Sequence, residues 1–160
     1  MKIKTLVAIL LLSGGVNSAF AQNDCNANSS ISHEAVKAGN FKDAYAPCMA
    51  VLKDCPTLRY YTFTDAQKIL VGFLNQIKDR NSADYKKYFD ELMNVYDLRM
   101  KYIPEFIQKG MKGVPSVADA LGAKAVDYIQ YAPQPDLDQA YQWLKESIEA
   151  EKAGSKLSLI

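Results

Sequence analysis

Apolar residues recur at helical spacing along most of this chain. Between residues 65 and 78 they lie at offsets of 0, 3, 4, 7, 8 and 11, namely at Ala66, Ile69, Leu70, Phe73, Leu74 and Ile77. Positions with this spacing share one face of a helix, because an α-helix turns once every 3.6 residues or so. The run of β-forming residues at 59–64 is short and has no partner of matching alternation. The pattern therefore predicts an all-α fold.

Turn and capping signals divide the chain into six predicted helices, at 29–38, 41–54, 65–78, 83–104, 116–131 and from 136 onward. Thr64 with Gln67 and Ser116 with Asp119 have the spacing of a capping box. Pro47 predicts either a kink in the second helix or a start nearer Ala46, because proline removes a backbone hydrogen bond. Short connections favour antiparallel packing, so we expect three helical hairpins.

The N-terminal segment has the order of a secretory signal peptide. Lys2 and Lys4 precede an apolar run at 6–12, and a small-residue motif ends at Ala21. The apolar run is far shorter than the roughly 20 residues that span a bilayer. We therefore expect a signal peptide at 1–21, a helical domain at 22–153, and a tail at 154–160 that is flexible or covered by a partner. The mature protein would be periplasmic or secreted, without a transmembrane segment.

Three cysteines in an exported chain favour one disulfide and one free thiol. Cys48 and Cys55 are seven residues apart around a helix end, about 10 Å along a helical axis, which exceeds the reach of a disulfide. Cys25 lies just before the first predicted helix and Cys55 ends the second, so an antiparallel hairpin would bring them together. We predict a bridge between Cys25 and Cys55. The alternative is that all three are buried thiols.

One segment resembles the tetratricopeptide repeat. It reads Lys-Ala-Gly-Asn-Phe-Lys-Asp-Ala at 37–44, and its second helix is followed by Pro56. The resemblance assigns structural roles to Gly39 at the turn, Phe41 at the second helix, Ala44 at the helix crossing and Pro56 at the end. The second half of the pattern recurs at 136–144, where it includes Ala140.

The segment at 55–65 is also similar to a group of uncharacterised exported bacterial tetratricopeptide proteins. The resemblance implies a right-handed array of three helical hairpins, with a concave groove lined by the first helix of each pair. Carried onto this chain, the groove residues are Lys68, Asn75, Gln76 and Lys124. Independently of the resemblance, Arg59, Tyr60 and Tyr61 form a candidate recognition patch, because arginine and tyrosine are enriched where proteins bind one another.

Little in the sequence indicates catalysis. His33 is the single histidine, and neither a metal-ligating cluster nor a phosphate-binding loop is present, so we predict no catalytic residue, metal or cofactor. The near-neutral charge, 19 basic against 18 acidic residues, argues against nucleic-acid binding. The leading hypothesis is a non-enzymatic envelope scaffold that binds a protein or peptide.

Two alternatives remain open. The apolar C-terminal residues suggest an N-terminal module of a larger envelope assembly. A small secreted enzyme or enzyme inhibitor would have to use the neighbourhood of His33 and Cys48, the one histidine and the one unpaired thiol.

Overall fold

The structure, a computed structural model, describes the backbone of residues 17–157 and the side chains of residues 24–153. This part of the chain contains no strand and folds into six helices, which confirms the all-α prediction. They are α1 (Asn17–Lys37), α2 (Phe41–Asp54), α3 (Tyr61–Gln76), α4 (Ala83–Gln108), α5 (Val117–Tyr131) and α6 (Leu137–Leu157).

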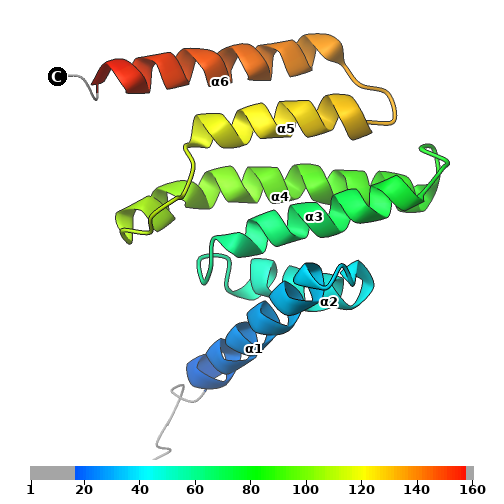
Figure 1. The fold of residues 1–160 in the computed structure, drawn as a ribbon, viewed down its shortest axis with the longest axis vertical. Helices are drawn as coiled ribbons and strands as arrows, with labels where there is room; N and C mark the ends of the chain where they lie inside the picture. The colour runs from blue at the N-terminus through cyan, green and yellow to red at the C-terminus, as the bar shows by residue number, and fades with distance from the viewer. Residues whose placement is uncertain (1–16, 158–160) are drawn as a thin grey trace, which may run out of the picture.

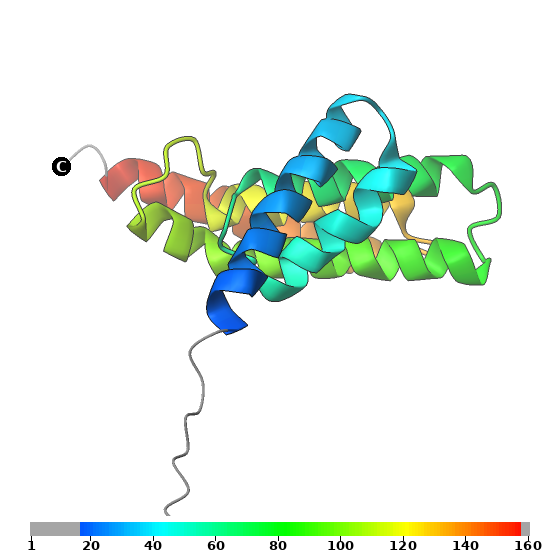
Figure 2. The same cartoon turned by 90° about the horizontal axis from the view of Figure 1, so that it is seen from below.

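The helices are stacked in chain order from α1 to α6 (Figure 1). Each of the pairs α1–α2, α3–α4 and α5–α6 packs together, and α3 also packs against both α1 and α2. The stack continues because α5 packs against α4. The α1–α2 pair is inclined to α3 and α4, as the view from below shows (Figure 2).

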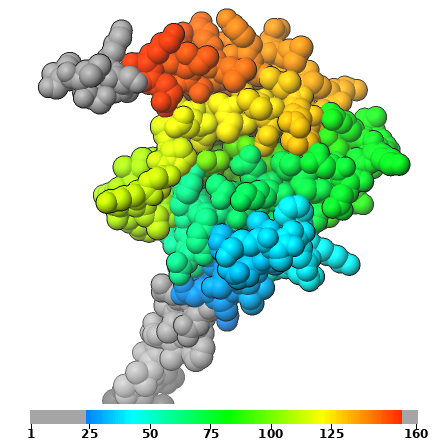
Figure 3. Space-filling view, viewed as in Figure 1, coloured from blue at the N-terminus to red at the C-terminus, as the bar shows by residue number. Residues whose placement is uncertain are grey.

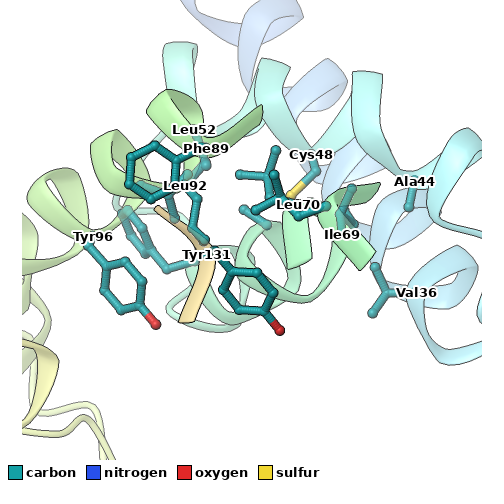
Figure 4. Close-up of a cluster of buried hydrophobic side chains, with 14 of the residues drawn as sticks. Val36, Ala44, Cys48, Leu52, Ile69, Leu70, Phe89, Leu92, Tyr96 and Tyr131 are labelled. Atoms are coloured by element: carbon teal, nitrogen blue, oxygen red, sulfur yellow. The ribbon is translucent and has the colours of Figure 1, made fainter. Parts of the chain in front are cut away.

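The buried core lies where α2, α3 and α4 meet. Figure 4 shows Cys48, Leu70 and Leu92, one from each of these helices, within a single cluster of apolar side chains. Tyr85, Tyr96 and Tyr131 place their rings in this cluster. The Tyr85 hydroxyl donates a hydrogen bond of 2.8 Å to the carbonyl of Tyr131. A buried tyrosine therefore joins the core to the end of α5.

Two prolines, Pro47 and Pro104, lie inside helices; the first agrees with the predicted helix at 41–54 and the second is contrary to the prediction. α2 begins at Phe41 rather than near Ala46, and Asn40 caps it by accepting a hydrogen bond from the Asp43 amide. α4 was predicted to close near Pro104 but continues to Gln108. Its residues Ile103 and Phe106, on either side of Pro104, are completely buried. Burial of these side chains offsets the lost hydrogen bond.

Two helix starts also differ from the prediction. α1 begins at Asn17, well before residue 29, so that Cys25 lies within the helix instead of preceding it. α3 begins at Tyr61 and takes in most of the β-forming run. The predicted capping box of Thr64 and Gln67 is absent, because the Thr64 hydroxyl donates to the Tyr61 carbonyl. Tertiary burial of Thr62 and Phe63 explains why this segment is helical.

Most of the residues assigned to repeat structure have a visible packing role. Gly39 turns the chain with a φ of +73°, a conformation that favours glycine. Ala44 is completely buried in α2, and Ala140 is nearly so in α6. The ring of Phe41 packs on α3 at Gly72. The capping box predicted for Ser116 and Asp119 is present at the start of α5.

A disulfide joins Cys25 of α1 to Cys55 at the end of α2, with 6.3 Å between their α-carbons. This is the pairing favoured from the sequence. Pro56 follows the bridge directly, where the chain leaves α2. The bridge closes the α1–α2 hairpin at the end opposite to its Gly39 turn.

The predicted signal peptide at 1–21 lies mostly outside the described residues, and its last five residues belong to α1. At the other end, α6 continues to Leu157, four residues into the predicted tail, and 158–160 lie outside the described residues. Among the helices that are described, none combines the length and hydropathy required to cross a bilayer.

Candidate functional site

A shallow pocket forms where the segment before α3 meets the loop between α4 and α5. We call it the loop pocket; its volume is about 340 Å³ and it is lined by Arg59, Tyr60, Tyr61, Met111, Lys112 and Val114. Gly110 and Gly113 let this loop turn, with φ values of +72° and +74°. The three residues predicted as a recognition patch thus lie together in one pocket.

Contacts with α1 and with Arg99 of α4 fix the two tyrosines of the loop pocket. The Tyr61 ring lies 4.2 Å from the His33 ring of α1, and its hydroxyl is 3.2 Å from that of Ser29. The Tyr60 hydroxyl accepts a 2.6 Å hydrogen bond from Nε of Arg99. Burial raises the pKa of Tyr60 above its usual value, so this hydroxyl is neutral at physiological pH. Rings fixed in this way lose little entropy on binding.

A second pocket lies beside the first, between α3, α4 and α5. We call it the α3 pocket; its volume is about 380 Å³ and it is lined by Thr64, Gln67, Lys68, Val71, Arg99 and Asp127. Arg99 belongs to this pocket and also bonds to Tyr60 of the loop pocket. The two pockets therefore adjoin along the N-terminal half of α3.

A chain of hydrogen bonds orders the floor of the α3 pocket. Gln67 donates to Asp127 at 3.0 Å and accepts from Arg99 at 3.5 Å. The Tyr96 hydroxyl also donates to Asp127, at 2.7 Å. Burial, and then the bond to this carboxylate, raise the pKa of Tyr96. The network ties α3, α4 and α5 together, so it positions the helices as well as the pocket.

More basic than acidic side chains line the two pockets. Arg59 and Lys112 are exposed at the loop pocket, and Lys68 is exposed at the α3 pocket. Arg99 donates to the neutral oxygens of Tyr60 and Gln67, which leave its charge uncancelled. Asp127 keeps its negative charge, because both of its hydrogen-bond donors are neutral, and Asp119 is used in the capping box of α5. Four basic side chains therefore line the two pockets against one acidic side chain. The surface is therefore suited to carboxylate groups next to apolar ones.

The other predicted groove residues, Asn75, Gln76 and Lys124, line neither pocket. Asn75 and Gln76 are exposed at the far end of α3, beyond both pockets. Lys124 does not line the groove: its side chain is buried, and its ammonium lies 2.5 Å from Asp97 of α4 and 4.7 Å from the centre of the Trp143 ring. The reason is that this face of α5 packs on α4. Lys124 holds α4, α5 and α6 together.

Sequence reasoning missed Arg99, Gln67 and Asp127 as parts of one site. They belong to three different helices, and Gln67 and Asp127 are 60 residues apart. Helical periodicity identifies the apolar face of each helix but carries no signal about which polar residues meet between helices. Lys112, between two glycines in a predicted loop, is the one missed residue that its local context could have indicated.

His33 and Cys48 do not form the thiol and base pair considered from the sequence. Nδ1 of His33 lies 2.7 Å from Oδ2 of Asp65, which is buried. Cys48 is completely buried, and its sulfur donates to the carbonyl of Thr62. Each therefore has its own partner. In the part of the chain with described side chains, no cluster of potential metal ligands occurs.

Cys48 should resist alkylation as long as the protein is folded. Burial raises the pKa of this thiol to about 11, so the reactive thiolate is scarce at about pH 8. Iodoacetamide followed by mass measurement should show no label on the native chain and one label after unfolding without reductant. The Cys48 thiol ionises at a lower pH in the unfolded chain than in the folded one. The free energy of unfolding should therefore fall as the pH rises from about 9 towards 11. Rapid labelling of the native chain would contradict this.

No protein-family model matches the chain, and comparison with curated proteins and with solved structures finds no match.

Proposed function

We propose that this protein is a non-enzymatic, exported interaction scaffold that binds a peptide or protein segment along α3. The observation that carries the proposal is the adjoining pair of pockets on the N-terminal half of this helix. Arg59, Tyr60 and Tyr61 line the first pocket and Lys68 the second. Both are open and shallow enough to accept an extended segment. Arg99 lines the second pocket and donates a hydrogen bond to Tyr60 of the first, so the two lie next to each other.

The chemistry of this surface suggests what it binds. Tyrosine rings offer apolar area that needs little ordering, since they are already packed against α1 and Arg99. Arg59, Lys112 and Lys68 offer positive charge around these rings. A segment in which acidic residues flank an aromatic or aliphatic one would satisfy both features. We infer that the partner carries such a segment.

The stacking of helical pairs supports a tetratricopeptide-like reading of the fold. The positive φ of Gly39, the packing of Phe41 on α3 and the burial of Ala44 and Ala140 support this reading. In such arrays the first helix of each pair lines the binding groove. Here α3 is the first helix of the second pair, and it lines the α3 pocket. The position of the candidate site therefore fits the proposed mode of binding.

Export to the periplasm or to the outside of the cell is part of the proposal. It rests on the signal-like order of residues 1–21 and on the disulfide, because disulfides persist mainly in oxidising compartments. A scaffold in the envelope meets partners that have also been exported.

Replacement of Arg59 by Glu should weaken peptide binding by about tenfold or more, because it reverses a charge at the edge of the loop pocket. A phage-displayed random peptide library selected on the purified chain should enrich acidic peptides with an apolar centre. Fluorescence anisotropy with a synthesised winner would then compare the native chain, Arg59→Glu and Lys42→Glu. Lys42 is an exposed lysine on α2, outside both pockets, so its reversal should change the affinity little.

Two controls make this test decisive. Circular dichroism should show equal helicity in the three proteins, because Arg59 and Lys42 are both exposed. Affinity should also fall as salt is raised, since the attraction is between exposed charges. The proposal fails if no peptide is enriched, or if the enriched peptides bind native protein and Arg59→Glu equally well.

A further inference from the structure

The outer face of α6 carries a row of exposed apolar side chains. Leu137 and Tyr141 are each 62% exposed, and Ile148 is 53% exposed. With the half-buried Leu144 they follow the spacing of four, three and four residues that places side chains on one face of a helix. Such a row usually faces another element. We call these four residues the α6 stripe.

Helix α5 extends this apolar surface. Ser147 packs on Gly122, and the rings of Trp143 and Tyr128 meet at one side of the α5–α6 contact. Val126 lies one helical turn after Gly122 on the other side, which is also the side of the α6 stripe. Val126 is 53% exposed. The apolar surface thus spans both helices of the last pair.

The corresponding surfaces of the earlier pairs are covered. α3 packs against both α1 and α2. α5 packs against α4 and reaches α3 through the bond between Gln67 and Asp127. α6 lies at the edge of the stack, as the space-filling view shows (Figure 3). Within the described residues, the α1–α2 and α5–α6 pairs at the two ends of the stack have outer faces without a further helix, and α5–α6 is the one of the two that carries a row of exposed apolar side chains there.

We propose that a second copy of this chain covers the surface, with the two α6 helices packed antiparallel. A two-fold axis between Gln142 and Trp143 places Leu137 opposite Ile148 of the second copy, and Tyr141 opposite its Leu144. The same four residues of each copy meet in this register, as a two-fold dimer requires.

Charge selects a second copy as the occupant. In this register Asp138 lies beside Lys145 of the second copy, and symmetry forms the pair twice. Both residues lie at the same side of the α6 stripe, seven residues apart, so they face each other across an antiparallel pair of helices. Lys145 is half exposed, and its Glu149 neighbour is 4.0 Å away, a contact that is weak in water. Lys145 can therefore turn towards Asp138 of the other copy.

Light scattering after size exclusion tests this with the purified protein. Over about a hundredfold range of concentration, the native chain should shift from monomer to dimer mass. Tyr141→Lys should remain monomeric throughout, because it places a charge in the apolar contact. Ile31→Lys is the matched control, since Ile31 is 56% exposed on α1, and it should dimerise like the native chain.

Charge reversal tests the register separately and involves exposed side chains, so folding is preserved. Asp138→Lys alone and Lys145→Asp alone should each raise the dimer dissociation constant by tenfold or more, because each creates like-charge pairs. The double variant Asp138→Lys, Lys145→Asp should restore the native value. A native chain that stays monomeric, a dimer that tolerates Tyr141→Lys, or a double variant that remains weak would each overturn the proposal.

Discussion

Replacing both Cys25 and Cys55 with serine is expected to lower the free energy of unfolding by about 3 to 4 kcal/mol. The bridge spans 30 residues and joins Cys25, within α1, to Cys55 at the end of α2. Without it, the unfolded chain gains the freedom that the closed loop denies, while the folded hairpin gains nothing. α1 packs mainly on α2, with a smaller contact to α3, so it depends strongly on this link.

Urea titration followed by circular dichroism measures this loss. A reducing agent should lower the stability of the native protein to the level of the double serine variant, and should leave that variant unchanged. Cys48→Ala is the control: it removes the free thiol and should keep the sensitivity to reductant. Peptide mapping without reductant should recover Cys25 joined to Cys55. A bridge that contains Cys48 would contradict the prediction. So would a native protein whose free energy of unfolding is unchanged after full reduction.

Replacing Gly72 with alanine is expected to destabilise the protein by about 2 kcal/mol, although alanine normally favours a helix. A β-carbon at position 72 would lie 2.3 Å from Cδ2 and 2.5 Å from Cε2 of the Phe41 ring. Atoms this close must move apart, so α2 and α3 would have to separate or the ring would have to leave its site. Either change disturbs the core on which both helices pack.

The sign of this effect should reverse when the ring is absent. In a Phe41→Ala background the space above Gly72 is empty, and Gly72→Ala should then stabilise the protein by about 1 kcal/mol through its helix propensity. The four proteins form a double-mutant cycle that can be measured by urea denaturation. If Gly72→Ala has the same effect with and without Phe41, the close contact between ring and backbone is not what position 72 requires.

Gly72 also shows how far sequence reasoning reached. The resemblance at 37–44 indicated that Phe41 packs at the start of the second helix, but the residue that receives the ring lies 31 positions further along the chain. A glycine in the middle of a helix is unfavourable in isolation. The reason for a glycine at position 72 is clear only from the tertiary structure, in which the Phe41 ring of α2 packs against it.

The helix boundaries illustrate the same limit. Ser116 and Asp119 are local partners, so their capping box could be predicted and is present. The box expected for Thr64 and Gln67 is absent, because α3 already begins at Tyr61 and the Thr64 hydroxyl donates to the Tyr61 carbonyl inside the helix. α4 continues past Pro104 because Phe106 is buried in the core. Local signals set a boundary only where tertiary contacts do not outweigh them.

The candidate site was predictable in the same partial way. Arg59, Tyr60 and Tyr61 are consecutive, so their residue types alone indicated a recognition patch, and they line one pocket. Lys124 was assigned to the groove by analogy and is buried against Asp97 and Trp143. Arg99 and Asp127 were not anticipated. Residue types indicated the chemistry of one short segment. They did not indicate which segments far apart in the sequence come into contact.

The sequence by itself determined the helical class, the division into three helix pairs and the choice of Cys25 and Cys55 as disulfide partners. These follow from periodicity, turn residues and the short reach of a covalent bond. The tertiary structure alone decided that α3, α4 and α5 share one polar network, that Lys124 is buried, and that the α6 stripe is left uncovered. The physical reason is that periodicity defines a helix face, whereas the partner of that face depends on how all six helices pack at once.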